Sequence, residues 1–154
     1  MIRKDSQKLF DLSNKSIVLT GSAGRLGTNF AQILSDAGAN LILVDIDEKK
    51  NEKLEKNISK KFKTKCICSN TNITNKLELE KLCKLTLKKF GTIDGLVNNA
   101  FYSPRTNIKK SAMKFEDYQS DLWNDVVSVN LTGVFLCCKY LEKLCLNKKR
   151  VEQL

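Results

Sequence analysis

The sequence has no histidine, and it has only one proline and one tryptophan among its 154 residues. Without an imidazole base, a serine or cysteine nucleophile of the histidine-activated kind is excluded. The usual zinc ligands are reduced to thiolates, and the six cysteines include no C-x-x-C pair. We therefore predict no metal site.

The cysteines lie inside apolar runs that are typical of strands and helices. A free cysteine in such a run behaves as a small hydrophobic side chain. We therefore expect buried thiols at Cys66, Cys68, Cys83, Cys137, Cys138 and Cys145.

Long apolar runs are missing as well. No window approaches the roughly 18 uninterrupted apolar residues of a membrane span. The start of the chain, "MIRKDSQKLFDLSNK", is charged and lacks the apolar stretch of a signal peptide. We expect a soluble, cytoplasmic protein with a single domain over residues 1–154, in which residues 1–14 form an N-terminal extension.

Positive charge is abundant, with a net charge of +10. The lysines are mixed with glutamates at helical spacing, as on solvated helix faces. These stretches carry neither interleaved aromatic residues nor a DNA-binding motif. We therefore expect no nucleic-acid partner and no membrane partner.

Short apolar runs alternate with helical patterns along the chain. Strands are predicted at 16–20, 40–46, 64–70 and 93–99, and helices after the first strand and at 47–62, 76–90 and 120–147. Such alternation builds right-handed β-α-β units and hence a three-layer α/β fold, a parallel sheet with helices on both faces. The predicted inward residues are Leu26, Phe30, Ile33, Leu34 and Ala37 in the first helix, Leu54, Ile58 and Phe62 in the second, and Leu79, Leu82, Cys83 and Leu87 in the third.

Three glycines spaced three apart follow the first strand. Gly21 permits a tight turn, Gly24 a close approach of backbone amides to a pyrophosphate, and Gly27 the packing of helix against sheet. The pyrophosphate would then lie at the positive end of the helix dipole. Asp45 ends the second strand, 18 residues after Gly27, where a carboxylate can accept hydrogen bonds from both ribose hydroxyls. The arrangement predicts a dinucleotide site.

Five segments resemble, in order, the motifs of the short-chain dehydrogenase/reductase (SDR) family. They are "TGSAGRLG" (20–27), "VDID" (44–47), "NTNIT" (70–74), "DGLVNNA" (94–100) and "WNDVVSVNLTGVF" (123–135). The resemblance covers nearly all of residues 16–147. It implies a Rossmann fold with strand order 3-2-1-4 in this chain and an NAD(H) or NADP(H) cofactor.

The resemblance also implies roles for single residues. Asn130 matches an asparagine that supports a proton relay through an ordered water, although by itself it reads as a helix residue that caps or solvates a kink. The residues implied to surround the cofactor are Gly21, Ser22, Ala23, Arg25, Leu26 and Gly27 at the pyrophosphate, Asp45 at the adenosine ribose, Asn72 and Ile73 at the adenine, and Asn99 and Ala100 along the cleft.

Two charged residues bear on the choice of cofactor. Arg25 could contact a 2′-phosphate and so hints at NADP, whereas Asp45 would repel one. A carboxylate about 4 Å from a phosphate costs about 1 to 4 kcal/mol at effective dielectric constants of roughly 80 to 20. We therefore predict NAD, with NADP the weaker alternative.

The family's chemistry requires a serine and a Tyr-x-x-x-Lys pair, in which the tyrosine is the general acid/base. Tyr102, Tyr118 and Tyr140 are followed four residues later by threonine, leucine and leucine, so the sequence has no such pair. The leading hypothesis is the cofactor-binding half, incomplete at its C-terminus, of an NAD(P)-dependent oxidoreductase that interconverts an alcohol and a carbonyl by hydride transfer.

Other functions stay open. The chain could be a non-catalytic dinucleotide-binding or scaffold protein that needs a second polypeptide, or a non-functional remnant. A methyltransferase of Rossmann type is disfavoured by "NNA" and "VNLTGVF". The substrate is an unknown small molecule, and a likeness to bacterial members that act on surface-sugar precursors favours a sugar derivative. The helix at 120–147 commonly forms a dimer interface in the family, which predicts a homo-oligomer.

Overall fold

The computed structural model describes residues 9–104 and 114–141. They form a four-stranded parallel sheet of order β3-β2-β1-β4. The strands are β1 (Ser16–Thr20), β2 (Asn40–Asp45), β3 (Cys66–Asn70) and β4 (Gly95–Val97). The predicted strand order is confirmed, although β4 is shorter than the predicted strand at 93–99.

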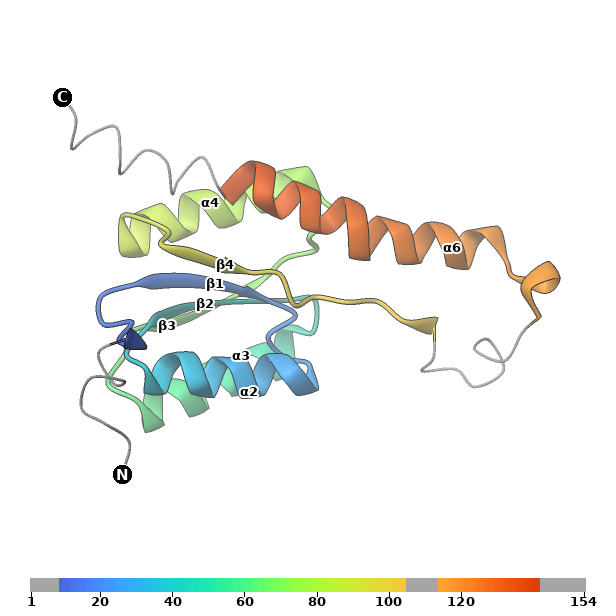
Figure 1. The fold of residues 1–154 in the computed structure, drawn as a ribbon. Helices are drawn as coiled ribbons and strands as arrows, with labels where there is room; N and C mark the ends of the chain where they lie inside the picture. Colours follow the sequence, from blue (N-terminus) through green and yellow to red (C-terminus); the bar gives the residue numbers. More distant parts are fainter. Residues whose placement is uncertain (1–8, 105–113, 142–154) are drawn as a thin grey trace.

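Helices cover both faces of the sheet. Figure 1 shows α2 and α3 on one face and α4 and α6 on the other, as expected where the chain reverses its direction across the sheet between β3 and β4. Their bounds are α2 (Arg25–Asp36), α3 (Glu48–Lys61), α4 (Lys76–Phe90) and α6 (Ser120–Val127). The three-layer α/β fold is thus as predicted.

The last predicted helix, at 120–147, is not a regular α-helix along its whole length. A short 3-10 turn, η2 (Phe115–Asp117), precedes α6, and a π-helical segment, η3 (Ser128–Gly133), follows it before the chain returns to α-helix over 134–141. The rest of the predicted helix, 142–147, lies outside the described residues.

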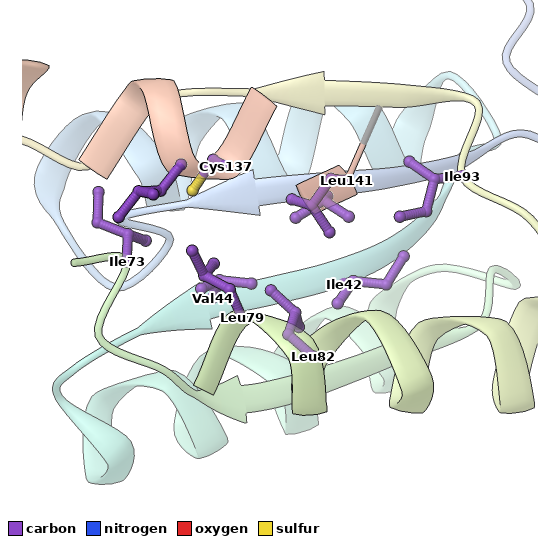
Figure 2. Close-up of a cluster of buried hydrophobic side chains, with 10 residues drawn as sticks. Ile42, Val44, Ile73, Leu79, Leu82, Ile93, Cys137 and Leu141 are labelled. Carbon is purple, nitrogen blue, oxygen red and sulfur yellow. The ribbon is translucent and has the colours of Figure 1, made fainter. Parts of the chain in front are cut away.

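The core has two parts, one on each face of the central strands β1 and β2. The first, shown in Figure 2, lies between the sheet and the α4 and α6 layer, and its buried members include Ile42, Val44, Ile73, Leu79, Leu82, Ile93, Cys137 and Leu141. The second lies under α2 and α3 and includes Leu19, Ala31, Leu41, Leu43, Leu54 and Ile58. Because both faces are covered, β1 and β2 carry continuous apolar runs at 17–19 and 41–44 rather than an alternating pattern.

The predicted inward face of α2 is wrong for three of its five residues, whereas Leu34 is half-buried and packs against the core under α2 and α3. Leu26, Phe30 and Ile33 have 64%, 38% and 65% of their surface exposed and form an apolar stripe on the outside of the helix. The helix instead turns Gly27, Ala31 and Ser35 to the sheet. Small residues permit the close approach of helix to sheet, and this geometry outweighs the hydrophobic area that the larger side chains would bury.

One further inward residue was predicted wrongly in α4. Leu87 is 39% exposed, whereas Leu79 and Leu82 are buried as expected. Leu87 lies in the last turns of the helix, which ends at Gly91 in the left-handed conformation. Leu87 therefore belongs to the partly solvated rim of this layer.

The cysteines are less uniformly buried than predicted. Cys66 and Cys137 are buried, Cys68 and Cys83 are half-buried, and Cys138 is exposed, which corrects the prediction for that residue. Cys138 follows Cys137 on the same helix, about 100° further around the helix axis, and so lies off the buried face. Cys145 lies outside the described residues.

Alkylation should separate these thiols. Burial raises the pKa of the Cys66 thiol to about 12, and burial likewise raises the pKa of Cys137 to about 12. At pH 8, about one molecule in ten thousand would carry the reactive thiolate at either position. With iodoacetamide and peptide mass spectrometry, we expect rapid modification of Cys138 and modification of Cys66 and Cys137 only in denaturant. Equal labelling of all three in the native chain would contradict the packing.

Two features are missing from residues 9–104 and 114–141. No helix there is both long and apolar enough to cross a membrane. No group of three or more cysteine and carboxylate side chains there is placed to hold a metal ion.

Candidate cofactor site at the carboxyl edge of the sheet

A cleft of about 980 Å³ lies where the four parallel strands end. Its walls come from the loop after β1, the end of β2, the segment after β3, the segment after β4 and the side of α6. Of the residues predicted to hold the cofactor, those that line the cleft are Gly21, Ala23, Arg25, Leu26, Gly27, Asp45, Asn72, Ile73, Asn99 and Ala100. Ser22 and Asn130 lie beside it.

The glycine loop passes so close to its neighbours that side chains are excluded. Gly21 has a φ of +64°, and a Cβ there would lie 2.6 Å from the Cα of Ala100. A Cβ on Gly27 would lie 2.1 Å from the carbonyl oxygen of Gly21. The first contact joins the loop to the segment after β4, and the second joins it to the first turn of α2. The two glycines therefore allow the loop to pack closely against the segment after β4 and against α2.

The N-terminus of α2 opens into this cleft without a side-chain cap. In contrast, the side chain of Asp47 caps α3, and that of Asn75 caps α4. The first turn of α2 has no acidic residue and carries Arg25. The amides in a first helical turn have no acceptor within the helix, and they lie at the positive end of the helix dipole. This end of α2 is therefore suited to a phosphate group.

Asp45, the last residue of β2, lies in the cleft wall beside the glycine loop. Its Oδ2 accepts a hydrogen bond of 2.9 Å from the amide of Ala23, and its Oδ1 accepts one of 2.9 Å from the amide of Asp47. These two bonds fix the plane of the carboxylate. Each oxygen can still accept a second hydrogen bond, so the group can receive two hydroxyls of a ribose.

A lysine that sequence reasoning did not single out lies in the same wall. The Nζ of Lys50 is 2.6 Å from the Oδ2 of Asp47. A hydrogen bond to Lys50 lowers the pKa of Asp47, and the same hydrogen bond raises the pKa of Lys50. The positive charge of Lys50 therefore lies near Asp45, and the carboxylate of Asp47 offsets it.

The segment after β3 forms a further wall. The Oδ1 of Asn72 accepts from the amide and the hydroxyl of Thr74 at 3.0 and 2.8 Å, which fixes the turn that leads into α4. Ile73 is 5% exposed and packs in the core against Gly133, where a Cβ would lie 2.7 Å from its Cδ1. Ile73 thus presents only its edge to the cleft.

A clamp joins the ends of β1 and β4. The Nδ2 of Asn99 donates to the carbonyl oxygens of Thr20 and Gly21 at 3.0 and 2.9 Å. The hydroxyl of Thr20, which is fully buried, accepts from the amides of Asn99 and Ala100 at 3.0 and 3.1 Å. Asn99 therefore shapes the floor of the cleft, and Thr20 is a supporting residue that the sequence analysis did not name.

Asn130 lies in the π-helical segment η3 and contacts the chain that follows β4. Its Oδ1 accepts from the amide of Tyr102 at 2.8 Å, and its Nδ2 donates to the carbonyl oxygen of Tyr102 at 2.9 Å. This paired contact attaches the helix to the segment that bears Phe101, which is 73% exposed at the cleft. Both polar atoms of the Asn130 side chain are thus used for this attachment.

Ser22 points away from the cleft. It is 0% exposed, and its hydroxyl donates a 2.7 Å hydrogen bond to the Oδ1 of Asn51 in α3. Its amide donates to the carbonyl oxygen of Val44 at 3.2 Å. Ser22 thus attaches the loop to α3 and β2 on the side away from the cleft, and its side chain does not line the cleft.

Sequence reasoning missed several residues of the cleft wall. Lys50 lies in the first turn of α3, and Asp125, Ser128 and Val129 lie where α6 passes into η3. The helix that follows each strand begins at the carboxyl edge of the sheet, so the first turn of α3 could have been inferred. The contribution of α6 depends on its tilt across the sheet, for which the sequence carries no signal.

A parallel sheet with a cleft at its carboxyl edge, a glycine loop that opens a helix and a carboxylate after the second strand define a dinucleotide-binding domain of Rossmann type. Within this class the family is also determined. The profile of the family described as short chain dehydrogenase matches residues 15–151, and the chain belongs to that family.

Individual relatives agree with this assignment. The chain is 28% identical over 145 residues to a short chain dehydrogenase/reductase of Macrophomina phaseolina, covering 94% of this chain and 79% of that one. It is 31% identical over 141 residues to the 5-keto-D-gluconate 5-reductase of Escherichia coli K12, covering 92% and 52%. The crystal structure of NAD⁺-bound xylitol dehydrogenase matches with a TM-score of 0.79 and 25% identity, covering 89% and 50%. The chain thus spans about half the length of the last two proteins.

Proposed function

We propose that this chain binds NAD and forms the cofactor-binding part of an oxidoreductase that interconverts an alcohol and a carbonyl. The observation that carries the proposal is that the uncapped N-terminus of α2 and the carboxylate of Asp45 lie side by side in one cleft, joined by the hydrogen bond from the amide of Ala23. The first suits a pyrophosphate and the second a ribose. Gly21 and Gly27 permit the close backbone packing that holds the glycine loop and the first turn of α2 in this position.

Different segments along the cleft would bind different parts of the cofactor. The loop and the first turn of α2 would hold the pyrophosphate, Asp45 the adenosine ribose, and the segment after β3 the adenine. The nicotinamide ring supplies or accepts the hydride when the cofactor is bound. Asn99 and Ala100 would support its end of the cleft through the clamp to Thr20, and Asn130 would hold the adjoining segment through Tyr102.

NAD is proposed over NADP because the carboxylate of Asp45, in the proposed role of binding the adenosine ribose, would repel a 2′-phosphate. Lys50 does not reverse this preference, since its ammonium group is engaged by Asp47 at 2.6 Å. The substrate class that we propose is a sugar derivative or a related polyol. Two names support it, the 5-keto-D-gluconate 5-reductase and the xylitol dehydrogenase to which the chain is similar.

A non-catalytic dinucleotide-binding protein that needs a second polypeptide is the second candidate. The observation in its favour is that none of the three tyrosines is followed by lysine four residues later. A tyrosine without that lysine lacks the neighbour that lowers its pKa for acid/base work. The two candidates share the cofactor site and differ in turnover. The homo-oligomer expected from the helix at 120–147 stays a prediction.

Titration of the purified chain with NADH, followed by fluorescence, tests the site. Asp45→Ala should weaken NADH binding by at least about 10- to 150-fold, because each hydrogen bond to a charged acceptor is worth about 1.5 to 3 kcal/mol. The same substitution should narrow the difference in affinity between NADH and NADPH, since Asp45 no longer repels a 2′-phosphate.

Asp36→Ala is the matched control. Asp36 is an exposed carboxylate at the C-terminal end of the same helix α2, at the opposite edge of the sheet. The Asp36→Ala substitution should leave the affinities for NADH and for NADPH unchanged. A folded wild-type chain without saturable NADH binding, or an Asp45→Ala variant that binds as tightly as wild type, would contradict the proposed site.

A further inference from the structure

Ser22, which was predicted at the pyrophosphate, is instead paired in the interior with Asn51, which was not predicted for the site. Asn51 lies in the first turns of α3 and is 1% exposed, and Ser22 lies in the glycine loop and is 0% exposed. Their side chains meet in a 2.7 Å hydrogen bond between positions 29 residues apart. A buried amide is costly unless its donors and acceptor are satisfied, so such a residue calls for an explanation.

Asn51 satisfies both sides of its amide. Its Oδ1 accepts from the hydroxyl of Ser22, and its Nδ2 donates to the carbonyl oxygens of Leu43 in β2 and Ser69 in β3 at 3.0 and 3.4 Å. One side chain therefore connects the glycine loop to two strands of the sheet. An apolar residue of similar size could fill the same volume but could make none of these bonds.

The loop on both sides of Ser22 faces the cleft. Gly21 precedes it in the left-handed conformation, and Ala23 follows it and donates its amide to the carboxylate of Asp45 at 2.9 Å. A displacement of Ser22 would therefore move the turn that approaches the pyrophosphate. It would also break the bond that orients Asp45. The two groups that we assign to the cofactor depend on the position of one serine.

We propose that Asn51 is a positioning residue of the cofactor site, which holds the glycine loop in its binding conformation through the hydroxyl of Ser22. The inference rests on the proposed function. Asn51 is too deeply buried to touch a ligand, and of the three groups that it bonds only Ser22 belongs to the glycine loop. A merely structural role would lower the stability of the fold and leave the affinity of the folded chain unchanged.

The test is a double-mutant cycle with Ser22→Ala, Asn51→Leu and both together. NADH dissociation constants are measured at a temperature where urea titration finds every variant folded. Each single variant should weaken NADH binding by about five- to tenfold, the effect expected when one buried hydrogen bond is lost. The double variant should be no weaker than the worse single variant, because both substitutions break the same bond.

Asn57→Leu is the matched control, since Asn57 is an exposed asparagine of the same helix α3, and it should bind NADH like wild type. If Asn51→Leu does not fold, Ser22→Ala alone decides, because it removes only a hydroxyl. Wild-type affinity in the folded single variants, or losses that multiply in the double variant, would overturn the positioning role while the proposed function stands. A folded wild-type chain that does not bind NADH would overturn both.

Discussion

Gly27→Ala is expected to destabilise the folded chain by about 3 kcal/mol or more, the upper range for overpacking of a tight site. A Cβ at position 27 would lie 2.1 Å from the carbonyl oxygen of Gly21 and 2.7 Å from the Cα of Ser22. Both contacts are with backbone, which cannot move aside as a flexible side chain can. Relief would require α2 to shift from the sheet or the glycine loop to move, and NADH binding should be lost in either case.

The matched control for Gly27→Ala is Gly95→Ala in β4. A Cβ there would meet only side-chain atoms of Ile17, the nearest at 3.6 Å, which is an ordinary van der Waals contact. We expect a change in the free energy of unfolding of less than about 1 kcal/mol. Urea denaturation followed by circular dichroism measures both variants. Equal stabilities would mean that α2 does not approach the loop as closely as described.

Leu43→Ala should lower the free energy of unfolding by about 2 to 5 kcal/mol, the range for a large-to-small change in a packed core. Leu43 lies in the middle of β2, is 0% exposed, and belongs to the core cluster under α2 and α3. The strand is paired on both sides, with Leu19 of β1 and Cys68 of β3. The surrounding backbone is therefore held in place and can fill little of the cavity that remains.

The same substitution at Leu77 serves as control. Leu77 lies in the first turn of α4 and is 69% exposed, so Leu77→Ala should change stability by less than about 0.5 kcal/mol. The measurement is the urea midpoint, with the slope of the transition as a check that the same surface is exposed on unfolding. A similar loss for both leucines would contradict the assigned burial.

Much of the fold followed from local patterns. The apolar runs of β1 and β2 are continuous because both faces are covered, and Gly91 ends α4 in the left-handed conformation that glycine allows. The inward face of α2 did not follow, because Gly27 and Ala31 face the sheet by virtue of their small size. A count of apolar residues favours the larger side chains, whereas the distance between helix and sheet favours the smaller ones.

Part of the candidate site, too, could be predicted from the sequence, and part could not. Gly21 and Asp45 could be placed in one cleft from the sequence, since the carboxyl ends of parallel strands meet at one edge. The bond between Ser22 and Asn51 could not, because it joins positions 29 residues apart through two buried polar side chains. Periodicity gives the direction of a side chain relative to its own element, and it does not give the partner that the side chain meets.

The apolar stripe on α2 has a consequence for the colloidal behaviour of the chain. Contact between two stripes of Leu26, Phe30 and Ile33 would release water and is favourable at short range. The net charge of +10 opposes the approach of two molecules at longer range. Added salt reduces the range of that repulsion to about 10 Å at roughly 0.1 M and leaves the short-range attraction in place. Ionic strength thus sets whether molecules in a concentrated solution stay apart or come into contact.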